Sequence, residues 1–362
     1  MKKIIALVLA LMMVLALCAC GSQGGTTEAA PAAEAAPAAE AAPAAEAEPA
    51  AEAEPAAEAE PAAGGDLDRN GDGKVTIGYS TIAYAIAPLT QFLCDNLNEL
   101  ATAEGWEFSY LAAEGDAMLQ GQQIETLVDQ DPDYLVIFPA DAELAIDWVE
   151  GAADEGVPVF LVGTDVAEEA HDSAIAFCGP DNYAMGVELA EALIAANGED
   201  AALGIVEIGG NAGQADYIDR KAGFEDTIAS SSNYTILGDT AWCHSSRTTA
   251  QDSMADFLST YGDQINVLYG MDDDLTLGGV NAIAEVGRDD IQVYSITGQV
   301  EAIQAIKDGK MVTTTYTPTR LTASLVIDAI NEYAANGSIE YYQSYLPDLI
   351  TADNADNYEG EF

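Results

Sequence analysis

The chain has 362 residues, with 62 Asp or Glu against 11 Lys or Arg, and its formal net charge at pH 7 is −51. So acidic a surface repels phosphate backbones, which excludes nucleic acid as a partner. Beyond an N-terminal leader and spacer the chain keeps about 300 residues, which is enough for two domains of ordinary size.

The leader has the three-part layout of an export signal. Lys2 and Lys3 precede an apolar run over residues 4–17, and small residues follow it. The run is too short to cross about 30 Å of hydrocarbon comfortably. The Leu-x-Ala-Cys motif that ends at Cys20 resembles the cleavage box of bacterial lipoproteins. It implies a signal peptide at residues 1–19 and a lipid on Cys20; an ordinary signal peptide with an incidental cysteine is the alternative.

Residues 20–65 are predicted to be a lipid-anchored linker. Between residues 26 and 63 the chain consists almost wholly of Ala, Pro and Glu, with no large apolar residue that could enter a core. Regular prolines break helices and the glutamates repel one another, so an extended spacer is expected, reaching ~100 Å at ~3 Å per residue. Such a spacer would hold a folded domain clear of the membrane.

Three cysteines, Cys94, Cys178 and Cys243, lie in the part of the chain that is predicted to fold. Each is surrounded by apolar or aromatic residues and is far from the others in sequence. Buried free thiols are therefore expected, with a bridge between Cys178 and Cys243 as the alternative.

From Lys74 onward, short β-rich runs alternate with longer helical patterns. The runs are nearly continuous in apolar residues, which is typical of parallel strands buried on both faces. The predicted strands are residues 75–79, 108–111, 134–138, 159–162, 175–177, 203–208, 234–237, 267–269, 291–296 and 312–316. The predicted helices are residues 89–104, 120–130, 144–155, 184–196, 218–229, 248–261, 276–286, 300–308 and 321–335. This repeat predicts an α/β fold with open, doubly wound parallel sheets.

A single barrel would give the same alternation of strand and helix. Gly179-Pro180 ends a predicted strand and Asp181-Asn182 opens the next helix, which is typical of a point where the chain leaves one lobe for another. We therefore expect two lobes. Ligands of open α/β sheets bind beyond the carboxyl ends of the strands, so the residues that follow each strand are the candidate site.

Several segments occur in an order that is more specific than any one of them. They are Tyr79-Ser80-Thr81, residues 123–141, Val157-Pro158-Val159, Gly179-Pro180-Asp181-Asn182, Gly209-Gly210, residues 219–224, residues 269–283 and residues 300–318. Together they resemble the type I periplasmic binding proteins, specifically the ribose- and galactose-binding group. The resemblance covers nearly all of residues 74–342.

The resemblance implies two doubly wound lobes joined by three hinge crossovers, near Gly179, Thr317 and Gln343. The N-terminal lobe would comprise residues 74–179 and 318–342, and the C-terminal lobe residues 180–317 and 343–353. It also implies a monomer without a cofactor that binds a sugar or polyol between the lobes and delivers it to the permease of an ABC importer. With the leader, this predicts an extracytoplasmic protein held at the cell membrane by its lipid.

Two other functions compete with this interpretation. A receptor of the same fold could hand its ligand-bound form to a membrane sensor instead of a permease. An extracytoplasmic α/β enzyme is the third hypothesis, but the sequence offers no catalytic constellation.

Sugar sites need planar polar groups for hydroxyl pairs and aromatic faces for the apolar side of the ring. Arg220 lies where the family supplies a ligand-gripping arginine; a surface ion pair is the alternative. Asp272 lies where the family has a ligand-contacting residue, and the following Asp273 is expected to cap the next helix. Carboxylates that serve only the helix cap and dipole are the alternative there.

Seven further positions follow predicted strands or the first crossover. The resemblance assigns stacking or polar contacts to the aromatic Tyr84, Trp242 and Tyr316, each of which could instead belong to the core. Polar contacts are also expected from Thr164, Asp165 and Asn182. Thr297 stands where ribose binders present an aspartate, and Tyr316 where they use glutamine. Fewer charged grips on hydroxyls favour a ligand other than ribose.

One segment resembles the first half of a calcium loop, with oxygen-bearing side chains at alternate positions: Asp66, Asp68, Asn70 and Asp72. The twelfth position would be Ile77 or Tyr79, where a bidentate Glu is needed. A turn rich in Asp and Gly is therefore preferred to a calcium site.

Overall fold

The computed structural model describes residues 66–85, 87–231 and 233–362 of the chain. The predicted signal peptide, the lipid site at Cys20 and the Ala/Pro/Glu spacer lie outside the described residues. Within the three described ranges, no helix has the length and apolar character needed to cross a bilayer.

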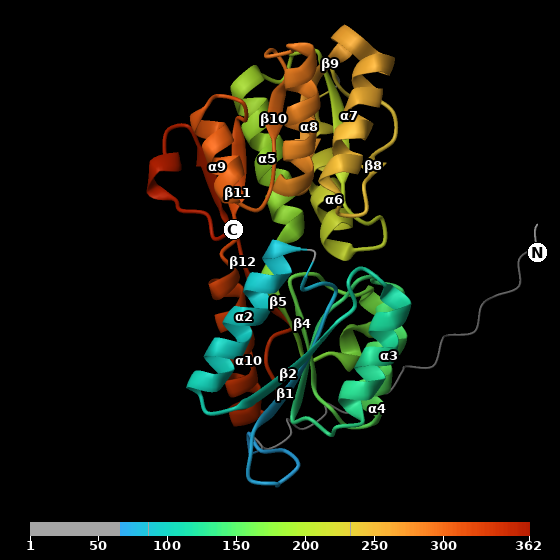
Figure 1. Ribbon diagram of the computed structural model, residues 1–362, viewed down its shortest axis with the longest axis vertical. Coiled ribbons are helices and arrows are strands. Elements are labelled where there is room, and N and C mark those ends of the chain that lie inside the picture. Colours follow the sequence, from blue (N-terminus) through green and yellow to red (C-terminus); the bar gives the residue numbers. More distant parts are fainter. Residues whose placement is uncertain (1–65, 86, 232) are drawn as a thin grey trace, which may run out of the picture. The chain divides into compact units, whose positions relative to one another are not determined.

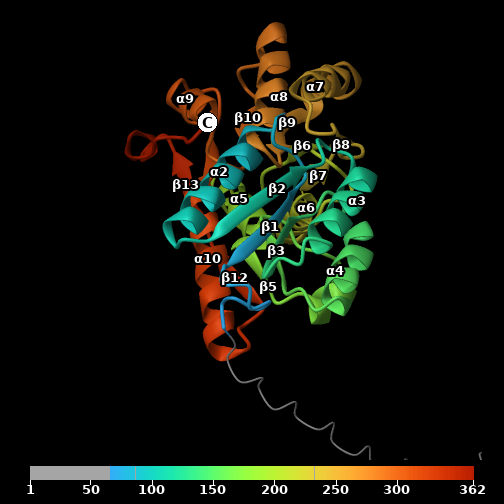
Figure 2. The same ribbon diagram turned by 60° about the horizontal axis from the view of Figure 1, so that its bottom comes forward.

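The first sheet has six strands in the order β12-β5-β4-β3-β1-β2, and all its pairings are parallel (Figure 1). Helices α2 and α10 pack on one face, and α3 and α4 on the other, as Figure 2 also shows. We call these elements the first lobe. Its strands are β1 (Thr76–Thr81), β2 (Glu107–Ala112), β3 (Tyr134–Phe138), β4 (Val159–Val162), β5 (Ala176–Pro180) and β12 (Tyr342–Tyr345).

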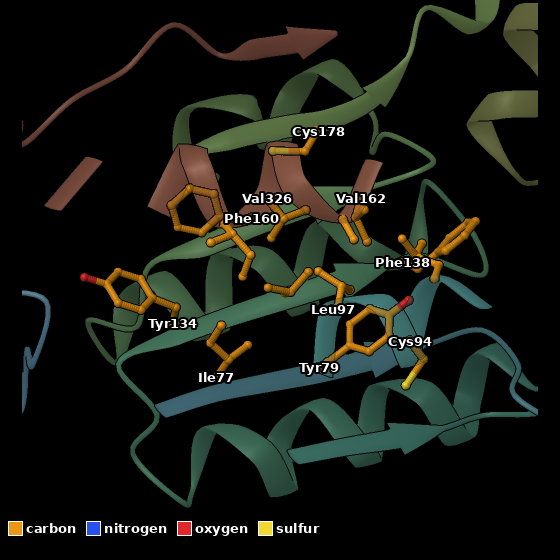
Figure 3. Close-up of a cluster of buried hydrophobic side chains, with 14 of the residues drawn as sticks. Ile77, Tyr79, Cys94, Leu97, Tyr134, Phe138, Phe160, Val162, Cys178 and Val326 are labelled. Atoms are coloured by element: carbon orange, nitrogen blue, oxygen red, sulfur yellow. The ribbon is translucent and has the colours of Figure 1, made fainter. Parts of the chain in front are cut away.

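Helices cover both faces of this sheet, and that explains the unbroken apolar runs of its central strands. In β3, Tyr134, Val136 and Phe138 join the core under α2 and α10. Figure 3 shows Tyr134 and Phe138 in this core. Leu135 and Ile137 point to the other face and join the core under α3 and α4. Successive side chains of a strand alternate between faces, so each face needs its own apolar set.

The second sheet has seven strands, six of them in the order β13-β11-β10-β9-β6-β7, while β8 pairs with β6. Helices α7, α8 and α9 supply the core of one face, and α5 and α6 that of the other. We call these elements the second lobe. Its strands are β6 (Leu203–Gly209), β7 (Tyr234–Ile236), β8 (Ala241–Trp242), β9 (Ile265–Gly270), β10 (Gln292–Tyr294), β11 (Thr313–Tyr316) and β13 (Asp348–Thr351).

Most of the helices begin or end at a residue suited to the position. Asp116, Ser246 and Asp272 accept hydrogen bonds from the first free N–H groups of α3, α7 and α8. The helices are α2 (Pro88–Ala103), α3 (Ala117–Val128), α4 (Leu144–Asp154), α5 (Asn182–Asn197), α6 (Ala215–Ile228), α7 (Arg247–Tyr261), α8 (Asp273–Val286), α9 (Val300–Lys307) and α10 (Thr319–Asn336), with 3-10 turns η1 (Glu168–Ser173), η2 (Gly262–Gln264) and η3 (Ala355–Asn357).

The chain passes between the two sheets three times within the described residues. It leaves the first sheet after Pro180, returns between Tyr316 and Thr319, and leaves again after Tyr345. The last passage lies beyond the expected one, because Gln343 still pairs with Cys178 in the first sheet. Two separate sheets rule out the single barrel.

Three strands were not predicted. β8 has two residues, and β12 reads Tyr-Gln-Ser-Tyr at the edge of the first sheet, so neither has an apolar run. β13 also lies at an edge, where it pairs antiparallel with β11. Edge strands bury little surface, and a hydrophobic pattern does not reveal them.

The three cysteines are free and buried, as expected. Cys94 and Cys178 belong to the core of the first lobe and Cys243 to a core of the second, so the alternative bridge between Cys178 and Cys243 is wrong. Burial raises the pKa of Cys94 and of Cys178 to about 12 and that of Cys243 above its usual value.

The Asp- and Gly-rich segment before β1 is a turn. Asp68 accepts hydrogen bonds from the backbone N–H groups of Gly71, Asp72 and Gly73 at 2.7, 3.1 and 2.7 Å. Asp72 accepts one from Lys74 N at 2.9 Å. Two of the candidate calcium ligands, Asp68 and Asp72, thus hydrogen-bond within the turn itself. No group of His, Cys, Asp or Glu suited to a metal occurs in the described part of the chain.

Candidate functional site

A cavity of about 350 Å³ lies beyond the carboxyl ends of strands from both sheets. The first lobe contributes residues that follow β1 to β5, together with α2 and α10. The second lobe contributes residues that follow β6, β8, β9, β10 and β11. This is where open α/β sheets bind ligands, and the cavity has the size of a small-molecule site.

Arg220 lines the cavity and is held on several sides. It is 5% exposed, its Nε donates to Asn182 Oδ1 at 2.9 Å, and its Nη1 donates to the Met271 carbonyl at 2.9 Å. The guanidinium also lies 5.5 Å from the centre of the Tyr217 ring. A planar donor group fixed in this way is prepared for ligand oxygens before any ligand arrives.

Two glycines position Arg220. A Cβ atom on Gly223 of α6 would collide with the Tyr183 carbonyl of α5, and one on Gly186 of α5 would collide with the Arg220 carbonyl. These helices therefore pack backbone against backbone, and only glycine permits that approach. Tyr269 of β9 adds a hydrogen bond from its hydroxyl to the same Arg220 carbonyl at 2.9 Å.

Asp216 lies one turn before Arg220 on α6 and also lines the cavity. Its Oδ2 is 3.6 Å from Arg220 Nη2, and its Oδ1 is buried without a hydrogen-bond partner. Burial raises the pKa of Asp216, and Arg220 opposes that rise. An unused acceptor in a buried place is a ready partner for a ligand donor.

Asp272 lines the cavity and also caps the N-terminus of α8. Its Oδ1 accepts hydrogen bonds from Asp274 N at 2.8 Å and Leu275 N at 3.4 Å, at the start of α8. Burial raises its pKa to about 7; Asp273 and Asp274 add to the rise, and Arg220 opposes it. The carboxyl group therefore titrates near neutral pH.

Asp273 does not cap α8, which corrects the role expected for it. Its carboxylate is turned away from α8 and accepts hydrogen bonds from Gly298 N, Gln299 N and Thr314 Oγ1 at 2.7, 2.8 and 2.7 Å. It thereby fixes the loop between β10 and α9, and the cap falls to Asp272.

That loop brings Thr297 to the cavity. Thr297 has a φ of 123°, which is strained for a β-branched residue. Its carbonyl accepts hydrogen bonds from Thr317 N and Thr317 Oγ1 at 3.2 and 2.9 Å, and Thr317 lines the cavity too. The second passage between the lobes is thus tied directly to a cavity residue.

The three aromatic candidates do not line the cavity. The Tyr84 hydroxyl donates to Asp95 Oδ1 at 3.0 Å, on the outside of the first lobe. Trp242 packs over Gly209, where the absence of a side chain makes room for the indole. Tyr316 packs against Tyr358, with ring centroids 5.2 Å apart. Each of the three rings therefore contacts neighbouring residues outside the cavity.

The three polar candidates near the first crossover lie behind the cavity. Thr164 is fully buried and accepts a hydrogen bond from Asp216 N at 3.0 Å, and Asn182 holds Arg220. Asp165 accepts a hydrogen bond from the Tyr341 hydroxyl at 2.7 Å. Asp165 also lines a second cavity of about 410 Å³, whose described lining carries three carboxylates and no basic side chain.

Sequence reasoning missed several polar residues of the first cavity, among them Gln214, Asp216 and Gln299. Gln214 and Gln299 are the residues that immediately precede α6 and α9. They follow strand ends like the residues that were predicted, so the rule for open sheets could have found them. Asp216 gives no such signal, because it lies within a helix.

The sequence profile of a family described as a periplasmic binding protein domain matches residues 77–338. The chain is 25% identical over 297 residues to the xylitol-binding protein of Mycolicibacterium smegmatis, covering 81% of each chain. It is 27% identical over 260 residues to the ribose import binding protein of Bacillus subtilis, covering 72% of this chain and 81% of that protein.

Solved structures are similar over most of the described residues. An ABC transporter solute-binding protein from Mycobacterium smegmatis with bound glycerol has 29% identity and a TM-score of 0.73, with 80% of this chain and 98% of the other covered. One from Bacillus halodurans with bound myo-inositol has 23% identity and a TM-score of 0.71, with 79% and 97% covered.

Proposed function

Because the chain belongs to the periplasmic binding protein domain family, we propose that it captures a sugar or polyol in the 350 Å³ cavity and delivers it to an ABC importer. The observation that carries this proposal is the cavity itself, to which both lobes contribute the residues after their parallel strands. The importer is favoured over a membrane sensor because the relatives named above bind or import sugars and polyols. The protein is a carrier and not an enzyme.

Three predicted residues line the cavity and are the proposed ligand contacts: Arg220, Asp272 and Thr297. Arg220 would donate to ligand oxygens, and Asp272 would accept from ligand hydroxyls through the oxygen that does not cap α8. Asn182 and Thr164 would act one step behind them, on Arg220 and Asp216. The two lobes, residues 74–180 with 318–345 and residues 181–317 with the segment after β12, would close around the ligand.

The leader and the spacer complete the proposal. Residues 1–19 would be removed as a signal peptide, and Cys20 would carry a lipid that anchors a monomer at the outer side of the cell membrane. Residues 20–65 would let the two lobes reach the permease. Labelling of cells with a radioactive fatty acid tests the anchor, because Cys20→Ala should abolish incorporation while Cys18→Ala should not.

Isothermal calorimetry with a panel of pentoses, hexoses and polyols tests the ligand class. One compound at least should bind with one site per chain, and saturation at 100 times the dissociation constant should raise the free energy of unfolding by about 2.7 kcal/mol. Arg220→Met should abolish that binding, whereas Arg320→Met, at an exposed arginine paired with Glu99, should not. A protein that binds no member of the panel does not have the proposed function.

A further inference from the structure

The two sides of the cavity differ in chemistry. The side formed by the first lobe is largely apolar, and its lining includes Ile82, Ala83, Pro88, Leu89, Leu93 and Phe138. The side formed by the second lobe is polar, and its lining includes Asn211, Gln214, Asp216, Arg220, Asp272 and Gln299. A ligand that fills the cavity meets carbon on one side and hydrogen-bonding groups on the other.

The polar side chains on the first lobe's side already make hydrogen bonds within that lobe. Glu114 accepts hydrogen bonds from the backbone N–H groups of Tyr84 and Ala85, at 3.3 and 3.1 Å. The Thr90 hydroxyl donates to the Ala87 carbonyl at 3.0 Å. A ligand hydroxyl turned to Leu89, Leu93 or Phe138 would lose its water without gaining a partner, which carries a free-energy cost.

The cavity-lining hydroxyls on α10 of the first lobe also make hydrogen bonds within the protein. Thr319 Oγ1 donates to Glu361 and accepts from Asn96 Nδ2, while Thr322 shares a hydrogen bond of 3.0 Å with the Tyr345 hydroxyl. Both hydroxyls hydrogen-bond to neighbouring elements. They hold α10 in place and do not extend the polar side.

The second lobe retains unused hydrogen-bonding capacity. Asp216 Oδ1 is buried and has no partner, and the residue as a whole is 5% exposed. Asp272 uses one carboxylate oxygen for the cap of α8. In the cavity lining these two carboxylates outnumber the single guanidinium of Arg220, which disfavours a phosphate or carboxylate on the ligand.

We propose that the ligand is an uncharged polyol or sugar that carries an apolar substituent, such as a deoxy carbon or an O-methyl group. Its hydroxyls face Asp216, Arg220 and Asp272, and its apolar part lies against Leu89, Leu93 and Phe138. This inference rests on the proposed function and narrows its ligand class. Each hydroxyl is thereby matched to an acceptor or donor, and the apolar part loses contact with water.

Calorimetry with matched pairs tests the inference on the full mature chain. The pairs are D-galactose and its 6-deoxy form D-fucose, L-mannose and its 6-deoxy form L-rhamnose, and myo-inositol and its O-methyl ether bornesitol, within a wider set of pentoses, hexoses and polyols. The substituted member of a bound pair should bind at least ten times more tightly than its parent. If parents bind as tightly as their substituted forms, this inference is wrong and the proposed function stands; if no compound binds, both are wrong.

A pair of variants assigns the preference to the first lobe. Leu89→Asn places an amide on the apolar side, and the preference for the substituted ligand should fall at least fivefold. Leu144→Asn makes the same change on α4, at a 41% exposed position outside the cavity, and should leave the preference unchanged. Circular dichroism confirms that both variants fold, and an unaltered preference in folded Leu89→Asn contradicts the inference.

Discussion

The guanidinium Nη2 of Arg220 lies 3.6 Å from Oδ2 of Asp216, and both residues are 5% exposed. The two charges are four residues apart on α6 and shielded from water, so each compensates the charge of the other. Removal of one partner leaves an uncompensated buried charge, which usually costs more than the pair contributes.

Arg220→Ala should therefore lower the free energy of unfolding by about 3 kcal/mol or more, as well as abolish binding. Urea unfolding measures the first effect. Arg320→Ala is the matched control: its partner Glu99 is exposed, and its loss should cost no more than about 1 kcal/mol. Equal stability of the two variants would show that Asp216 does not depend on Arg220.

Ligand binding should weaken as the pH falls below about 7. Burial raises the pKa of Asp272 to about 7, and only its ionised form accepts hydrogen bonds with both oxygens. Protonation in this range should raise the dissociation constant by up to about tenfold per pH unit. Calorimetry between pH 5 and pH 8 checks this, and Asp272→Asn, which keeps the helix cap, should give weak and flat binding.

The stability of the unliganded protein should show the opposite trend. The pKa values of Asp219 and Asp273 are raised to about 6 and that of Asp272 to about 7, while an unfolded Asp titrates near 3.9. Between pH 4 and pH 7 the folded state holds more protons, so the free energy of unfolding decreases as the pH rises. Unfolding curves at several pH values measure this slope, which should be smaller in Asp272→Asn. A slope of the other sign contradicts the raised pKa values.

The close backbone contact between α5 and α6 predicts that a larger residue at Gly223 lowers the free energy of unfolding. Gly223→Ala would push a methyl group into the Tyr183 carbonyl, and separation of the helices should cost about 1–3 kcal/mol and displace Arg220. Gly151→Ala makes the same change at an exposed position of α4, where nothing lies within 4 Å, and should be neutral or stabilise by up to about 1 kcal/mol. If both glycines tolerate alanine equally, the close packing does not position Arg220.

The sequence predicted the interior of this fold better than its site. Strands β3 and β4 coincide with their predicted bounds, because continuous apolar runs have no other place than a buried parallel strand. Three site predictions lie at the cavity: Asp272 and Thr297 follow strand ends and also match the family resemblance, whereas the resemblance alone pointed to Arg220. The aromatic residues did not, since a ring after a strand packs wherever there is space.

Side-chain direction is what the sequence could not supply. Asp272 and Asp273 are adjacent carboxylates, yet one caps α8 and the other binds the loop between β10 and α9. The choice between them depends on the Gly298 and Thr314 partners, which are distant in sequence and meet only in the folded sheet. The helix-capping role was therefore assigned to Asp273, one position away from Asp272, which has it.

The reactivity of the three buried cysteines can report on local unfolding of the protein. With the pKa of Cys94 and of Cys178 near 12, their sulfurs are almost entirely protonated at neutral pH and react slowly with disulfides or alkylating agents. In the folded protein these two thiols are therefore protected from disulfide exchange. Cys94 and Cys178 lie in the first lobe and Cys243 in the second, so the rate at which each cysteine is alkylated would show which lobe unfolds first.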